Sequence, residues 1–146
     1  MTIEDLTAEI RHWRWTGYKA VNLLIGAGTL LLYEFVGRPI YRPYIYANQL
    51  NDFHIADTLG NTLGTITTVF VAIAVFSKDR AGGFFILKMA TLGVVLFELL
   101  HPLLGKPTDV WDVAATLLTG AFCYAIFDFI STRSIPQSPV TNQPVD

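Results

Sequence analysis

Four long runs of apolar residues divide the chain, at residues 17–36, 55–76, 82–100 and 110–130. Each run is close to the ~20 residues that a helix needs to cross a hydrocarbon core of about 30 Å. No run alternates strictly between apolar and polar residues, and backbone groups in lipid must be satisfied within their own segment. The pattern therefore predicts an all-α membrane protein with four transmembrane helices arranged as two successive helical hairpins.

Composition supports this class. Hydrophobic residues make up 52% of the 146 residues and charged residues 15%, against about 45–50% and about 25% in an ordinary soluble domain. The formal net charge of −2 lacks the basic excess of a nucleic-acid-binding protein, so we expect no nucleic acid partner. The single Cys123 excludes a disulfide framework within the chain and a multi-cysteine zinc site.

The two ends of the chain differ from the spans. Residues 1–16 are amphipathic and carry Trp13 and Trp15, which predicts an interfacial segment ahead of an uncleaved first span. Residues 131–146 are polar and contain proline, which predicts a disordered cytoplasmic tail. Basic residues near the span ends set the orientation, six on one side against three on the other: Arg11, Arg14, Lys19, Lys78, Arg80 and Arg133 against Arg38, Arg42 and Lys106. We expect a multi-pass protein of the inner (plasma) membrane with both termini cytoplasmic.

The two hairpins look like one pattern written twice. Placing Asp57 over Asp112 puts Asn61 over Thr116, and each hairpin has a Glu near the end of its first span. Two successive hairpins place both connections on one membrane face, here the outer one. Half of the acidic residues therefore converge there: Glu34, Asp52, Asp57, Glu98, Asp109 and Asp112.

Ionisable groups within spans are costly and usually face a partner or a water-filled cavity. Helical spacing places many polar residues on shared faces, with Asp57, Asn61, Gly64 and Thr68 forming one stripe. We therefore predict an outward-facing polar pocket that binds a ligand through Glu34, Arg38, Asp57, Asn61, Glu98, His101, Lys106, Asp109, Asp112 and Thr116. The structural alternative is that these groups only cap and pin the helix ends. No motif indicates a catalytic nucleophile, a metal site or a cofactor.

The run FELLHPLLGKPTDVWDVAATLLTG, residues 97–120, resembles the signature of the VanZ-like membrane proteins. The match rests on five positions, namely Glu98, Lys106, Asp109, Asp112 and Gly120. The chain departs from the family pattern at His101, where Gln is expected, at Lys106, where Arg is usual, and at Thr116, where Asn is common. The resemblance implies a small multi-span envelope protein, associated in some members with low-level glycopeptide resistance, and it implies no settled reaction.

Three functions remain open from the sequence. The first is a VanZ-like protein, not demonstrably an enzyme, that binds a lipid-linked or amphiphilic ligand among the membrane lipids. The second is a small membrane enzyme that uses Glu98, His101, Asp109 and Asp112 as an acid and base cluster. The third is a proton-coupled transporter, expected as a homo-oligomer because four short spans enclose little volume. Residues 37–54 form the longest connection, either an aromatic belt in the headgroup layer or a lid over the pocket.

Overall fold

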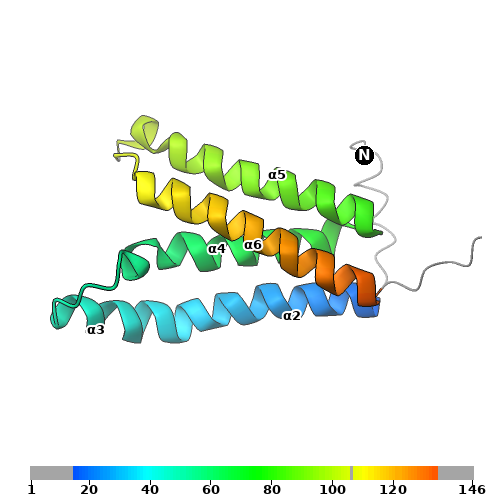
Figure 1. Ribbon diagram of the computed structural model, residues 1–146, viewed down its shortest axis with the longest axis horizontal. Helices are drawn as coiled ribbons and strands as arrows, with labels where there is room; N and C mark the ends of the chain where they lie inside the picture. The colour runs from blue at the N-terminus through cyan, green and yellow to red at the C-terminus, as the bar shows by residue number, and fades with distance from the viewer. Residues whose placement is uncertain (1–14, 106, 135–146) are drawn as a thin grey trace, which may run out of the picture.

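The computed structural model describes residues 15–105 and 107–134, and this part of the chain is helical without strands (Figure 1). The elements in chain order are α2 (Gly17–Leu32), the π-helix η1 (Tyr33–Tyr41), α3 (Arg42–Ala47), α4 (Ile55–Phe76), α5 (Arg80–Leu99), the 3-10 turn η2 (His101–Leu104) and α6 (Val110–Ser134). Four helical stretches are long and apolar enough to cross a membrane: Gly17–Ala47, Ile55–Phe76, Arg80–Leu99 and Val110–Arg133. The predicted all-α fold with four candidate spans is confirmed.

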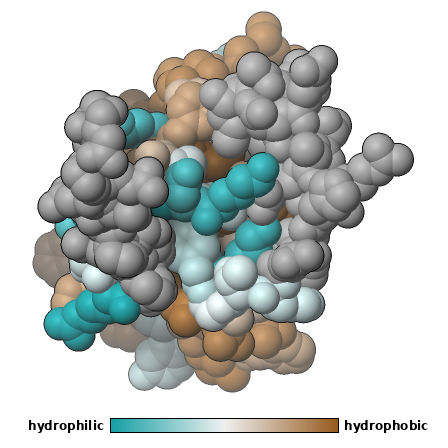
Figure 2. Space-filling model, turned by 90° about the vertical axis from the view of Figure 1, so that its right-hand side faces the viewer, coloured by the Kyte–Doolittle hydropathy of each residue, from teal (hydrophilic) through white to brown (hydrophobic). Residues whose placement is uncertain are grey.

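Helix α4 lies at the centre of the bundle, because it packs against α2, α5 and α6, whereas α2 touches α6 only slightly. The long helices run roughly along one axis (Figure 1). One end of the bundle, called here the acidic end, carries residues 48–54 and 100–109. The other, called the Ser77 end, carries the turn at residues 77–79 and both ends of the described chain. Figure 2 looks onto the Ser77 end and shows hydrophilic residues near its centre, with hydrophobic residues above and below them.

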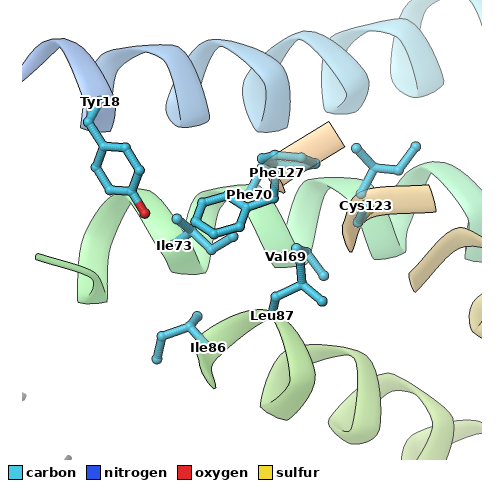
Figure 3. Packing of buried hydrophobic residues seen from close by; sticks show 9 residues of the cluster. Tyr18, Val69, Phe70, Ile73, Ile86, Leu87, Cys123 and Phe127 are labelled. Atoms are coloured by element: carbon cyan, nitrogen blue, oxygen red, sulfur yellow. The ribbon is translucent and has the colours of Figure 1, made fainter. Parts of the chain in front are cut away.

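The apolar core fills the half of the bundle nearer the Ser77 end. Its buried side chains come from all four long helices and include Tyr18, Val69, Phe70, Ile73, Ile86, Leu87, Cys123 and Phe127 (Figure 3). Polar side chains are buried in both halves, for example Asn22 and Ser77 nearer the Ser77 end and Glu98 and Thr116 nearer the acidic end. Most remaining large apolar side chains are exposed, as expected for helices that face lipid.

The first helical stretch is longer than the sequence predicts. The sequence predicts a connection over residues 37–54, but helical backbone continues through η1 and α3 to Ala47, so only residues 48–54 connect it to α4. Pro39 lies within η1. A proline cannot donate to the helix and clashes with the carbonyl four residues earlier, and the wider π turn accommodates it. Pro43 lies in the first turn of α3, where proline is tolerated.

The length of this stretch places α3 beyond the other helices. Its 31 residues span about 46 Å at 1.5 Å each, against a hydrocarbon core of about 30 Å. The excess lies at the acidic end, where α3 projects past the rest of the bundle (Figure 1). A second correction concerns the tail, because α6 continues to Ser134 and residues 131–134 are helical. The predictions for residues 1–14 and 135–146 lie outside the described residues.

Candidate functional site

Glu98 is a buried carboxylate at the acidic end. It lies in the last turn of α5, and only 3% of the residue is exposed. The chain then turns into η2, which places His101 Nδ1 3.1 Å from Glu98 Oε2. The His101 ring also packs edge-on against Phe97, with 5.0 Å between ring centroids. Glu98 Oε2 has no aligned hydrogen bond in spite of its contact with the imidazole.

Helix α6 brings two further carboxylates to this group. Asp109 precedes the helix, and its Oδ1 accepts a hydrogen bond from the backbone N–H of Trp111 at 2.8 Å. Asp112 lies in the first turn, where the unpaired N–H groups and the helix dipole stabilise a negative charge. Both carboxylates are close enough to Glu98 for electrostatic interaction. Three acidic side chains therefore lie within electrostatic range of one another, near one histidine.

Helix α4 contributes polar groups from the other side. The Asn61 side chain lies within reach of both Glu98 and Asp112, although its Nδ2 has no aligned hydrogen bond. Thr65, one turn further along α4, and Thr116, one turn past Asp112 on α6, are fully buried, and neither hydroxyl has a hydrogen-bond partner. Buried polar groups in native proteins nearly always have partners. These atoms therefore offer bonding positions to a polar ligand.

We call this group the Glu98 site and define it by Asn61, Glu98, His101, Asp109, Asp112 and Thr116. It holds three carboxylates, one imidazole, one amide and one buried hydroxyl. No group of three or more His, Cys, Asp or Glu side chains in the described residues has the geometry to hold a metal ion. The site can accept hydrogen bonds from a cationic ligand, and the Glu98 carboxylate and the His101 imidazole lie 3.1 Å apart.

Asp57 belongs to a separate network that flanks the site. Its two carboxylate oxygens accept a hydrogen bond from Tyr46 Oη at 2.6 Å and contact His54 Nδ1 at 3.1 Å. Arg42 donates to Tyr46 Oη at 3.3 Å. The His54 ring stacks on Trp111, with 5.2 Å between centroids and 14° between ring planes. This network ties α3 and the start of α4 to the start of α6.

The structure therefore separates the predicted pocket into three parts. Asn61, Glu98, His101, Asp109, Asp112 and Thr116 form the Glu98 site, whereas Asp57 lies at its edge. Glu34 and Arg38 are exposed on η1 and pair with each other at 3.5 Å, so they do not join the other acids as predicted. The stripe of residues four apart on the first helix turns away from the bundle before it reaches Glu34, because four residues turn a helix by about 40° more than one full turn, and Leu30 is already exposed whereas Asn22 and Gly26 are buried. Lys106 lies outside the described residues.

Sequence reasoning also missed residues that the structure places near the site. The predicted stripe on α4 includes Gly64 and Thr68, but Thr68 is exposed and open space adjoins Gly64. The buried polar side chain on this part of α4 is Thr65 instead. The spacing of four from Asn61 could have indicated Thr65. Nothing in the sequence indicates the pairing of Tyr46 with Asp57, eleven residues apart. It depends on the helical conformation of α3.

No family model, curated protein or solved structure matches the chain. The assignment to all-helical membrane proteins therefore rests on the helices themselves.

Proposed function

We propose that the chain is a VanZ-like protein of the cell envelope whose acidic end faces outward and binds the amine-bearing head group of an amphiphilic or lipid-linked ligand. The observation that carries the proposal is the buried carboxylate of Glu98, whose Oε2 has no aligned hydrogen bond. Burying a charged group without full pairing is costly, so a native protein keeps such a group where it has a use. An ammonium group supplies the positive charge and the hydrogen-bond donors that would pair with the Glu98 carboxylate.

The charge of the site favours a cationic head group. Glu98, Asp109 and Asp112 are electrostatic neighbours, and His101 is the basic side chain paired with them in the described part of the site. Charge-assisted hydrogen bonds from an ammonium to a carboxylate are about twice as strong as neutral ones. The site should therefore prefer a primary amine over an uncharged hydroxyl of the same size.

The position of the site favours an amphiphile. Glu98 lies in the last turn of a candidate span, and Asp112 in the first turn of another, at the depth where the hydrocarbon core meets the headgroups. A ligand with its head group here can keep its apolar part in the surrounding lipid. The exposed apolar side chains nearby, including Leu103 and Val110, continue the lipid-facing surface to the edge of the site.

The resemblance to VanZ-like proteins supports the same conclusion. Three of the positions that carry it, Glu98, Asp109 and Asp112, belong to one site. The family association with glycopeptide resistance leads us to propose a role in glycopeptide tolerance. In a susceptible bacterial host, expression of the wild type should raise the inhibitory concentration of a glycopeptide, and Glu98→Gln should not.

Thermal unfolding in nanodiscs of zwitterionic lipid tests binding. We expect dodecylamine to raise the Tm of the wild type and dodecanol to leave it unchanged, since a ligand at 100 times its Kd stabilises by about 2.7 kcal/mol. Glu98→Gln should abolish the shift. Glu34→Gln is the matched control, because Glu34 is an exposed carboxylate that pairs only with Arg38 among the interactions described for it. Equal shifts with amine and alcohol, or equal losses in the two variants, would contradict the proposal.

Proton-coupled transport is a second candidate, favoured by the 3.1 Å contact between Glu98 and His101 at the acidic end of the bundle. It predicts that proteoliposomes with the wild type take up dodecylamine when a pH gradient is applied, and that Glu98→Gln proteoliposomes do not. Binding without gradient-dependent uptake would leave ligand binding as the function.

A further inference from the structure

Two buried threonine hydroxyls lie beneath the carboxylates of the Glu98 site, on the side toward the middle of the bundle. Thr65 of α4 and Thr116 of α6 are both 0% exposed, and neither hydroxyl has a hydrogen-bond partner. Other threonines bond to their own backbone, since Thr58 and Thr132 each donate to a carbonyl three or four residues earlier, at 2.9 Å. Thr65 and Thr116 therefore keep bonding positions that their own helices do not satisfy.

The direction of the helices brings the two hydroxyls to the same depth. Helices α4 and α6 both begin at the acidic end and run the same way (Figure 1). Asn61 of α4 lies within reach of Asp112 of α6, and each threonine follows one of these two residues by four positions. Four residues advance a helix by about 6 Å. Both threonines therefore lie about 6 Å deeper in the bundle than Asn61 and Asp112.

Glu98 approaches the two threonines from the other direction. Side chains on a helix lean toward its N-terminus. Helix α5 runs opposite to α4 and α6, so Glu98 leans toward the middle of the bundle, whereas Thr65 and Thr116 lean toward the acidic end. The Glu98 Oε2 atom, which has no aligned hydrogen bond, and the two threonine hydroxyls therefore converge in the interior between α4, α5 and α6.

These three acceptors match the three N–H donors of a primary ammonium. A trimethylammonium group has the same charge but no N–H, and it would leave both buried hydroxyls unpaired. Proteins bind quaternary ammonium groups with cages of aromatic faces. In the described part of the site the nearby rings already contact other side chains, since Phe97 packs edge-on against His101 and Trp111 stacks on His54. The chemistry of the interior therefore suits a primary ammonium.

We propose that Thr65 and Thr116 restrict the ligand of the Glu98 site to head groups that carry a primary ammonium, and that they exclude choline-type head groups. The ammonium donates one N–H to Glu98 Oε2 and one to each threonine hydroxyl. This inference rests on the proposed function, because it concerns the ligand of the same site. It adds a specificity that charge cannot supply, since both kinds of head group carry one positive charge at neutral pH.

Titration of the protein in dodecyl maltoside micelles, which contain neither amine nor choline, tests the inference. The two probes are dodecylamine and dodecyltrimethylammonium at neutral pH. We expect the wild type to bind dodecyltrimethylammonium at least tenfold more weakly, because it makes none of the hydrogen bonds that the ammonium makes.

Variants of the two threonines identify the source of this discrimination. A variant with both Thr65→Val and Thr116→Val should bind dodecylamine about tenfold more weakly and dodecyltrimethylammonium as the wild type does. Thr65→Ser with Thr116→Ser keeps both hydroxyls and should keep the discrimination. Thr67→Val is the matched control and should change neither affinity. The Thr67 hydroxyl is also unpartnered, but it lies about 200° around α4 from Thr65, where the Thr67 backbone adjoins Gly26 of α2.

The outcomes separate this inference from the proposed function. Equal affinities of the wild type for the two probes would overturn the inference and leave the proposed function standing. Failure of both probes to bind the wild type would overturn both. A double valine variant that discriminates as strongly as Thr67→Val would also overturn the inference, because the specificity would then come from another part of the site.

Discussion

The packing around Gly83 gives the sharpest test of how the helices fit together. Gly83 is buried on α5, where a Cβ atom would lie 2.6 Å from the Tyr18 hydroxyl oxygen and closer still to the Phe127 ring. Neither neighbour can move freely. Tyr18 Oη is within 3.2 Å of Ser77 Oγ, and Phe127 is fully buried. Helices α2, α5 and α6 thus meet at a position that only glycine fits.

Gly83→Ala should therefore destabilise the bundle. Adding a methyl group to a filled core costs typically 1–3 kcal/mol, and the replacement of a helical glycine by alanine returns roughly 0.5–1 kcal/mol. Gly93→Ala is the matched control, because Gly93 lies on the same helix and nothing stands within 4 Å of its added Cβ. It should leave stability unchanged or raise it by up to about 1 kcal/mol. We expect the two variants to differ by about 1–3 kcal/mol.

Reversible unfolding in mixed micelles, with an increasing fraction of SDS, measures this difference. Helical circular dichroism and tryptophan fluorescence should give coincident transitions if the bundle unfolds as one unit. A Gly83→Ala variant as stable as Gly93→Ala would refute the reasoning, because it would mean that α2, α5 and α6 do not meet at Gly83.

Three further predictions concern the acidic end. Thr116→Val should raise the free energy of unfolding by about 1 kcal/mol, because it removes a buried unpaired hydroxyl, and should weaken the dodecylamine shift; a lower Tm would contradict this. Tyr46→Phe removes the 2.6 Å hydrogen bond to the α4 carboxylate and should speed amide hydrogen exchange within residues 42–47; unchanged exchange would show that this bond does not hold α3. A double-mutant cycle of His54→Ala and Trp111→Ala should give a coupling energy of about 0.5–1.5 kcal/mol from the stacked rings, and a value near zero would exclude the contact.

The fold was largely predictable because backbone N–H and C=O groups in lipid must be hydrogen-bonded within the protein, which favours helices. A run such as residues 55–76 is apolar, long enough to span, and bounded by polar residues, and α4 matches it residue for residue. The first stretch was harder to predict. Pro39 and Pro43 in a segment rich in Tyr and Arg favour a loop by local propensity, whereas the structure keeps the helix and absorbs Pro39 in a π turn. The local preference of proline to end a helix does not predict that a π turn will accommodate it within one.

The site was predictable where helical spacing and hairpin topology decide it. Glu98 and His101 are one turn apart, and two hairpins bring Asp112 to the same end, so these residues meet as predicted. The same topology predicts that Glu34 joins them, but the structure places Glu34 on an exposed face of η1, where it pairs with Arg38. The burial of Glu98 could not be predicted, since the sequence does not specify how closely α4, α5 and α6 pack around it.

The central claim is that Glu98 binds a cationic head group at the acidic end. Equilibrium titration of nanodisc-embedded protein with radiolabelled dodecylamine tests it most directly. We predict that Glu98→Gln binds at least tenfold more weakly than the wild type, because a hydrogen bond to a charged group contributes about 1.5–3 kcal/mol and 1.4 kcal/mol is tenfold in Kd. Glu34→Gln should bind like the wild type. Equal affinities for the wild type and Glu98→Gln would contradict the account and leave Glu98 a purely structural residue.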